Sequence, residues 1–191
     1  MIITKSILED KREKYFSQIE KGAVFVFPSD TIYGLGCNAT DDEAVLRLRK
    51  IKSSKEIPFS VIAPSTNWIK ENCIMTPKIT EWVDKLPGPY TYVLKLKNKS
   101  AVSKHLNSKD DTIAIRIPEH WISDYVSELG IPITATSANM HGQEYEHDVD
   151  EFHPSLKNNV DFIIHEEFKP DSPSDIVHLH TDEIKIIKRR K

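Results

Sequence analysis

Residues 23–36, with the sequence AVFVFPSDTIYGLG, decide the fold of this 191-residue chain. The first five of them form a continuous apolar run that ends at Pro28, which is typical of a strand buried on both faces of a sheet. Small polar residues and two glycines follow. Because proteins built from alternating strands and helices place their sites at strand ends, residues 28–36 are predicted to be a loop that borders a site.

The rest of the chain alternates between helical and strand patterns on both sides of this stretch. Ser6 with Glu9, and Thr40 with Glu43, have the spacing of capping boxes at helix starts. Apolar spacing predicts helices at 6–22, 41–52, 66–72, 77–86, 119–129 and 148–157. Short apolar or alternating runs predict further strands at 59–63, 90–97, 112–117, 132–136, 160–164, 175–179 and 184–188.

These elements predict an α/β fold (α+β-like) in a single domain that spans residues 1–191. Not every pair of strands has a helix between its members, so the twisted sheet is expected to be mixed. The hydrophobic share of 39% suits one compact globular domain.

Composition excludes several classes of function. With 26 basic and 29 acidic residues the net charge is −3, so an RNA partner would need a local basic patch. The two cysteines, Cys37 and Cys73, form no CxxC pair, which argues against a disulfide framework or a thiolate zinc site. The eight histidines match no known zinc pattern. A signal-peptide pattern and a membrane-length apolar run are also lacking, so we expect a cytoplasmic protein without membrane contact.

The loop after the first strand holds the first candidate site residues. Ser29 and Thr31 offer hydroxyls to a small polar ligand, and Gly34 and Gly36 would let the backbone approach it closely. A plain turn with capping hydroxyls is the alternative interpretation.

Three lysines, Lys50, Lys52 and Lys55, lie at the end of the helix predicted at 41–52 and in the loop after it. They suit a charge clamp on a polyphosphate. The alternative is simple stabilisation of the helix C-terminus by cations.

Three further candidates follow later strands. Arg116 lies on the strand face opposite Ile115 and Ile117, where it needs an anionic partner or solvent. Ser137 and Asn139 can donate to and accept from a nucleotide or an amino acid, although an Asn-containing turn would look the same. Residues 172–175 (SPSD) fit a capping turn as well as a site.

Taken together, five segments resemble the motifs of the YrdC family of threonylcarbamoyl-AMP synthases. They occur in the order of that family and are PSDTIYGLG (28–36), PGPYT (87–91), IRIP (115–118), TSAN (136–139) and SPS (172–174). The resemblance extends from about residue 5 to residue 189, as in the short, single-domain members. It implies a twisted mixed sheet flanked by helices around a large concave cavity.

The resemblance also implies a reaction. Threonine takes up bicarbonate to form a carbamate, whose oxygen attacks the α-phosphate of ATP, and pyrophosphate leaves. The resulting threonylcarbamoyl-adenylate passes to the threonylcarbamoyl transferase complex that modifies adenosine in tRNA. Mg²⁺ is expected with ATP, no tightly bound cofactor is expected, and direct contact with tRNA or double-stranded RNA is a further expectation.

Roles carry over from the family by position. Contacts to threonine are expected from Thr31, Arg116, Ser137 and Ser174. Contacts to ATP are expected from Lys52, Lys55, Thr112, Asn139, and Lys188 or Arg189. The resemblance implies that Lys52, Arg116 and Ser137 act in catalysis by positioning the substrates and neutralising charge.

The sequence departs from the family pattern in four places. The motif that usually reads PST is Pro173-Ser174-Asp175, and the R-x-G that follows the last strand in the family is replaced by residues 188–191 (KRRK). Ser54 stands where the family has an arginine, in a loop that is one residue shorter, and apolar Ile62 stands where the family has a polar contact to threonine. Two alternatives therefore stay open. One is a related carbamoyl-adenylate-forming enzyme with another acceptor, and the other is a non-catalytic protein that binds RNA or a nucleotide.

Overall fold

The computed structural model describes residues 1–54, 57–107, 109–139, 146, 148–167 and 172–189. Within them, ten strands form one sheet. The strands are β1 (Ile2–Thr4), β2 (Phe25–Phe27), β3 (Gly34–Gly36), β4 (Ser60–Ile62), β5 (Tyr90–Lys95), β6 (Thr112–Arg116), β7 (Ile133–Ser137), β8 (Phe162–His165), β9 (Asp175–His178) and β10 (Lys185–Ile187). The helices are α1 (Lys5–Asp10), α2 (Arg12–Glu20), α3 (Asp42–Ile51), α4 (Thr66–Asn72), α5 (Pro77–Val83), α6 (Ile122–Leu129) and α7 (Pro154–Lys157).

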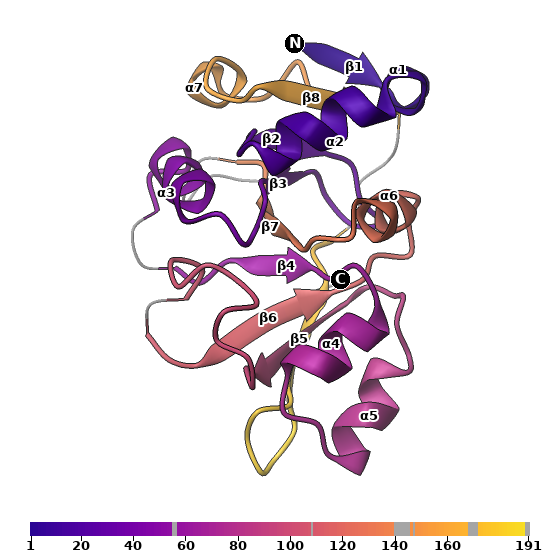
Figure 1. The fold of residues 1–191 in the computed structure, drawn as a ribbon, viewed down its shortest axis with the longest axis vertical. Helices are drawn as coiled ribbons and strands as arrows, with labels where there is room; N and C mark the ends of the chain where they lie inside the picture. Colours follow the sequence, from indigo (N-terminus) through magenta and orange to yellow (C-terminus); the bar gives the residue numbers. More distant parts are fainter. Residues whose placement is uncertain (55–56, 108, 140–145, 147, 168–171, 190–191) are drawn as a thin grey trace.

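The sheet is mixed, as the sequence predicts. Its order is β1-β8-β2-β3-β7-β4-β6-β5-β9-β10. Strand β8 pairs in parallel with β1 and β2, β4 with β6, and β5 with β9, whereas the other neighbours are antiparallel. This order places β7, from late in the chain, between β3 and β4 at the centre of the sheet (Figure 1).

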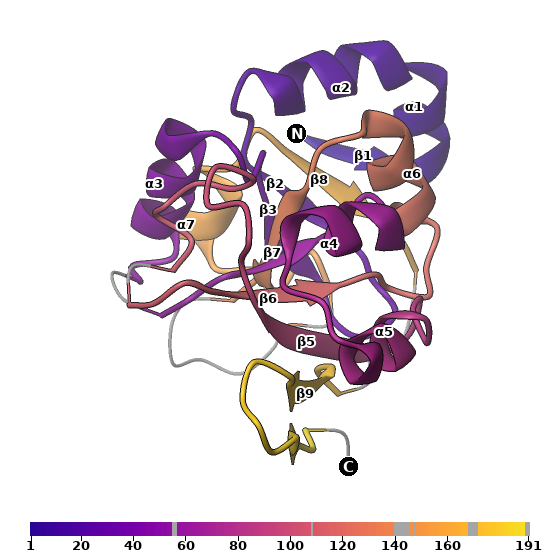
Figure 2. The ribbon, with the colours of Figure 1, turned by 60° about the horizontal axis from the view of Figure 1, so that its bottom comes forward.

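Helices cover both faces of the sheet and form two apolar clusters. Strand β2 is buried on both faces as predicted, because Val26 packs in one cluster while Phe25 and Phe27 pack in the other. Helices α1, α2 and α6 contribute to the cluster around Phe25, and α3, α4, α5 and α7 contribute to the larger one. Figure 2 shows α3 and α7 together on one side of the central strands and α1 and α6 on the other.

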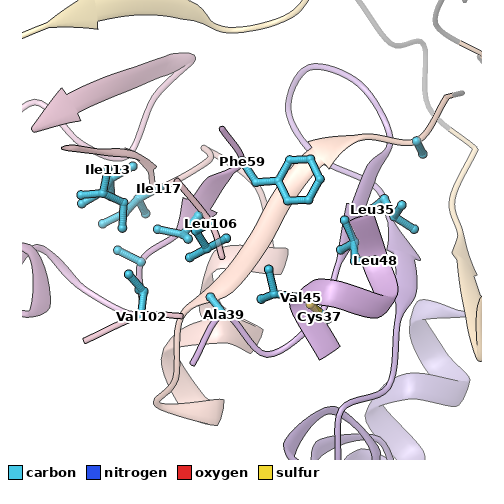
Figure 3. Packing of buried hydrophobic residues seen from close by; sticks show 14 of the residues in the cluster. Leu35, Cys37, Ala39, Val45, Leu48, Phe59, Val102, Leu106, Ile113 and Ile117 are labelled. Carbon is cyan, nitrogen blue, oxygen red and sulfur yellow. The ribbon is translucent and has the colours of Figure 1, made fainter. Parts of the chain in front are cut away.

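The larger cluster fixes the position of α3. Asp41 caps this helix by accepting from the amides of Glu43 and Ala44. Val45 and Leu48 then pack beside Leu35 of β3, in a cluster that includes Phe59 and Leu106 (Figure 3). The end of α3 is therefore held close to the centre of the sheet.

Four expectations about individual elements were wrong. Thr40 does not cap α3, because Asp41 does so and the Thr40 hydroxyl donates to Asn38 Oδ1. The single helix expected at 6–22 is two helices, α1 and α2, which are separated at Lys11. The first of them begins at Lys5 and is capped by Thr4, whose hydroxyl accepts from the Ile7 amide, and not by Ser6. Residues 34–36 form strand β3 instead of part of a loop. The helix expected at 148–157 is confined to Pro154–Lys157 in the described residues, because proline favours the first turn of a helix over its interior.

Candidate functional site

A cavity of about 520 Å³ opens over the middle of the sheet. Its walls come from the β2–β3 connection, the end of α3 with the segment that leads into β4, and the end of β7. Residues just before β9 and just after β10 complete the lining. The concave cavity expected from the family resemblance is therefore present, and it joins segments that are far apart in the sequence.

Small side chains on three central strands form the floor of this cavity. Ser60 of β4 is in register with Ala114 of β6 and with Ala135 of β7, and all three line the cavity. Because protein interiors are closely packed, larger side chains at these positions would fill the space. On β6, Arg116 shares the cavity face with Ala114 while Ile115 packs in the opposite cluster, as the strand pattern predicts.

The two glycines of β3 make room for a protein side chain, while their expected close approach to a ligand stays a prediction. A Cβ on Gly36 would lie 2.8 Å from the Phe27 ring and 2.8 Å from the carbonyl oxygen of Thr134. A Cβ on Gly34 would collide with the same ring. Phe27 lines the cavity, so the glycines shape the cavity wall through Phe27.

Arg116 is buried at the end of β6, where its guanidinium meets the β2–β3 connection. Its Nη1 donates to Thr31 Oγ1 at 3.1 Å, and its Nη2 forms a buried ion pair with Asp30. Burial lowers the pKa of Arg116 and Asp30 raises it, but arginine stays charged. Its Nε is buried without a hydrogen-bond partner among the described residues. An anionic ligand would satisfy such a donor.

The β2–β3 connection is held by its own hydroxyl groups. Ser29 Oγ donates to the carbonyl oxygen of Ile32 at 2.7 Å and accepts from the Thr31 amide at 3.3 Å. Asp30 also accepts from the Glu119 amide at 3.1 Å, which ties the connection to the chain after β6. Thr31 is therefore presented to the cavity in a fixed geometry.

Lys52 lies just after α3 and turns inward instead of stabilising the helix end from solvent. Its Nζ donates to the carbonyl oxygen of Ser137, to Asn139 O and Asn139 Oδ1 at 2.9 Å each, and to Ser137 Oγ at 3.1 Å. Burial lowers the pKa of the Lys52 ammonium to about 8. The contacts bring three of the predicted residues together at the end of β7. Lys50, by contrast, is exposed.

Ser174 and Arg189 form the opposite wall. Ser174 Oγ shares a hydrogen bond of 2.7 Å with Thr91 Oγ1 of β5. Arg189 donates from Nε to the Ser174 carbonyl oxygen at 2.8 Å, and its amide donates to Asp175 Oδ1 at 2.9 Å. These contacts hold the chain after β10 beside the start of β9.

The lining has a one-sided charge. Among the described residues it includes three cations, Lys52, Arg116 and Arg189, and no carboxylate. Hydroxyl groups make up most of the remaining polar lining, and they belong to Ser29, Thr31, Tyr33, Ser54, Ser60, Thr91, Thr136, Ser137 and Ser174. Such a site favours an anionic ligand with several oxygen atoms.

Comparison with known proteins agrees with this geometry. The family model Sua5_yciO_yrdC, described as "Telomere recombination", matches residues 17–190. The chain belongs to the Sua5/YciO/YrdC family. A relative from Methanocaldococcus jannaschii with the name "Putative threonylcarbamoyl-AMP synthase" is 33% identical over 186 residues, which cover 92% of this chain and 86% of the relative.

Solved structures of the Sua5/YciO/YrdC family have the same fold. The chain matches P. abyssi Sua5 complexed with L-threonine with a TM-score of 0.85 and 26% identity, covering 98% of this chain and 56% of that one. It therefore spans little more than half the length of that Sua5 chain. Escherichia coli YciO matches with a TM-score of 0.81 and 27% identity, covering 93% of this chain and 87% of that one.

Not all predicted site residues lie at the cavity. Thr31, Lys52, Arg116, Ser137, Asn139, Ser174 and Arg189 line it. Thr112 does not line it, because Thr112 is the first residue of β6 and lies about 13 Å from Arg116 along the strand. The amide of Thr112 donates to Asp110 at 2.8 Å. Lys188 is exposed and Lys55 lies outside the described residues. The proposed contacts of these last three residues with ATP stay predictions.

Five hydroxyls that line the cavity were not predicted from the sequence to contact a ligand, namely those of Tyr33, Ser54, Ser60, Thr91 and Thr136. Ser60 and Thr91 lie in strands whose short patterns do not show which face meets a cavity. The pairing of the strands decides which face meets the cavity, because Ser60 lies opposite Ala114 and Thr91 lies opposite Ile176. Ser54 also lines the cavity, and its hydroxyl is buried without a hydrogen-bond partner among the described residues.

Two other features, a metal cluster and a membrane-spanning helix, are lacking in the described residues. The described part of the chain contains no group of three or more His, Cys, Asp or Glu side chains that could hold a metal ion. Across the same residues, no helix is both long enough and apolar enough to cross a membrane.

Proposed function

We propose that this protein is an L-threonylcarbamoyladenylate synthase, which forms threonylcarbamoyl-AMP and pyrophosphate from L-threonine, bicarbonate and ATP. The observation that carries the proposal is the cavity, whose described lining holds three cations and many hydroxyls and no carboxylate. Threonine, bicarbonate and ATP are all anions or carry a carboxylate, so one such cavity suits all three. Membership of the Sua5/YciO/YrdC family and the threonine complex of P. abyssi Sua5 support it.

Threonine is proposed to bind at the Arg116 end. The Nε of Arg116 has no hydrogen-bond partner among the described residues and is the donor proposed for the threonine carboxylate, because Thr31 and Asp30 already occupy Nη1 and Nη2. The hydroxyls of Thr31 and Ser174 are the polar groups proposed to orient the rest of the amino acid.

ATP is proposed to bind between Lys52 and Arg189, with Asn139 and Ser137 at the junction of the two substrates. The Lys52 ammonium would neutralise charge on the transferred phosphate. Mg²⁺ enters as the complex with ATP, and because the described lining has no carboxylate, phosphates and water would supply its ligands.

The chemistry needs positioning more than a covalent intermediate. The threonine amine condenses with bicarbonate, and water leaves as the carbamate forms. A carbamate oxygen then attacks the α-phosphorus, and the bond to the β-phosphate oxygen breaks as pyrophosphate leaves. In-line alignment and cations on the phosphate oxygens supply the catalysis, which Lys52, Arg116 and Ser137 can provide without a nucleophile.

The product is a mixed anhydride that water can hydrolyse. Transfer to a threonylcarbamoyl transferase complex acting on tRNA is therefore the proposed next step. The net charge of −3 gives no support to tight direct binding of tRNA by this chain.

Pyrophosphate release tests this function. Purified protein receives ATP, Mg²⁺ and bicarbonate with each amino acid in turn, and release is expected only when both bicarbonate and threonine are present. Lys52→Met should abolish it, whereas Lys50→Met is the matched control because Lys50 is exposed two residues earlier. Release with another amino acid would favour a different acceptor. No release with any amino acid would contradict the proposal and favour a binding protein.

A further inference from the structure

Arg49, which no family motif includes, is a buried arginine on α3 that contacts two separate segments of the chain. Its guanidinium donates to the carbonyl oxygens of Ser54 at 3.2 Å and Ile57 at 3.0 Å. It also donates to the carbonyl oxygens of His105 at 2.7 Å and Leu106 at 2.9 Å. One side chain therefore ties the segment before β4 to the segment before β6.

The same guanidinium stacks on an aromatic ring of the cavity wall. Its Cζ lies 4.3 Å from the ring centroid of Phe59, and the Phe59 amide donates to the Leu106 carbonyl oxygen that Arg49 also contacts. Phe59 and Leu106 belong to one apolar cluster (Figure 3). Arg49 itself does not line the cavity, although Ser54, Ile57 and Phe59 do.

The turn after α3 brings Ser54 to the cavity. Ser53 has a left-handed φ of 52°, its amide donates to the Lys50 carbonyl oxygen, and the Ser54 amide donates to the Arg49 carbonyl oxygen. This pair of bonds is a Schellman motif. The result is a Ser54 side chain that is 3% exposed and lines the cavity, with a hydroxyl that has no hydrogen-bond partner among the described residues.

We infer that Arg49 is a positioning residue for the end of the cavity that binds the nucleotide. Arg49 holds the cavity wall from outside the cavity, so that the Ser54 hydroxyl donates to a phosphate oxygen. This inference rests on the proposed function for the identity of the ligand. The serine side chain is shorter than the arginine that the family has at this position, so it reaches only a phosphate oxygen that lies close by. The cavity wall that carries Ser54 must therefore be held in place.

Three variants and one control test the inference. Arg49→Met removes the donors, Arg49→Lys keeps one cationic donor group, and Ser54→Ala removes only the hydroxyl. Arg47→Met is the control, because Arg47 lies on the same helix and pairs with Asp161 at the surface. For each, calorimetry measures the binding of ATP, pyrophosphate and threonine, and hydrogen exchange reports on the Ser54 and Phe59 amides.

Arg49→Met is expected to speed exchange at Ser54 and Phe59 and to weaken ATP and pyrophosphate binding about tenfold, with threonine binding changed less than about twofold. Arg49→Lys should lie between this variant and the wild type. Ser54→Ala should weaken ATP about three- to tenfold without faster exchange. Arg47→Met should match the wild type in all measurements.

Two results would overturn the inference. One is unchanged exchange at Ser54 and Phe59 in Arg49→Met. The other is a uniform effect, in which exchange rises equally at the Ile163 amide of β8 and threonine binding falls as much as ATP binding. If wild-type protein binds neither ATP nor pyrophosphate, the proposed function fails and so does the role of Ser54, while the exchange rates still decide whether Arg49 holds the wall.

Discussion

Arg116 is a buried cation that the fold itself holds in a fixed position at the cavity. Its guanidinium is buried and held by Thr31 and Asp30, and its Nε has no hydrogen-bond partner within the part of the chain that the structure describes. Replacing Arg116 with a neutral residue would leave the Asp30 carboxylate buried without its partner and destabilise the fold. A loss of ligand binding in such a variant would not separate a lost ligand contact from a damaged fold. A lysine at this position keeps the charge but loses the planar fork.

Arg116→Lys is therefore expected to weaken threonine binding about 10- to 100-fold while ATP binding changes less than about threefold. Calorimetric titration with each ligand separately measures both effects. Equal losses for the two ligands, or no loss for threonine, would contradict the assignment of Arg116 to the threonine carboxylate.

Lys52 gives the site a dependence on pH. Burial lowers its pKa to about 8, so the ammonium is charged below that pH and increasingly neutral above it. A phosphate ligand favours the charged form, and binding above pH 8 must then take up a proton. ATP affinity should fall as the pH rises from about 7 to about 9, and calorimetry in buffers of different ionisation enthalpy should detect the proton uptake.

Lys52→Arg is the companion variant, because arginine stays charged through this range. It should bind ATP with an affinity that barely depends on pH between about 7 and about 9. A wild-type affinity that is equally flat would show that Lys52 does not meet the phosphates.

At the scale of single elements, the β2–β3 hairpin depends on its glycines. Gly36→Ala places a Cβ 2.8 Å from both the Phe27 ring and the Thr134 carbonyl oxygen. It should lower the free energy of unfolding by about 2 kcal/mol or more, because neither neighbour has room to move in a packed core. Gly88→Ala is the control, since its Cβ would meet Tyr90 only at 3.4 Å, and it should change stability by less than about 0.5 kcal/mol. Chemical denaturation measures both, and similar losses in the two variants would contradict the packing argument.

The same hairpin shows what could be predicted for an element from sequence. The apolar run at residues 23–27, which contains β2, indicates burial on both faces because five apolar residues follow one another. Strand β3 was missed because a three-residue strand with two glycines has no pattern of its own. Its existence depends on pairing with β2 and β7, which are contacts that local sequence does not encode.

For the whole molecule, sequence predicts the class of fold and many of the site residues but not how they meet. Arg116 could be assigned to the cavity face because strand alternation fixes its direction. Arg49 could not be singled out, because its partners His105 and Leu106 lie more than fifty residues away along the chain. Thr112 matched the family by position, yet the strand carries it away from the cavity, next to Asp110.

The order of strands explains how the site is assembled. Strand β7 inserts between β3 and β4, and this brings Ser137 and Asn139 to the Lys52 ammonium at the end of α3. The parallel pairing of β5 with β9 brings Ser174 beside Thr91. The anion site is thus a property of the complete sheet, because no contiguous segment of the chain holds more than part of it.

Labelled bicarbonate tests the proposed reaction, because its carbon atom must appear in the product. Protein is incubated with ATP, Mg²⁺, L-threonine and ¹³C-labelled bicarbonate, and the adenylate product is identified by mass spectrometry. We expect one molecule that contains AMP, threonine and the labelled carbon. An adenylate of threonine without the label, or AMP and pyrophosphate formed without threonine, would contradict it.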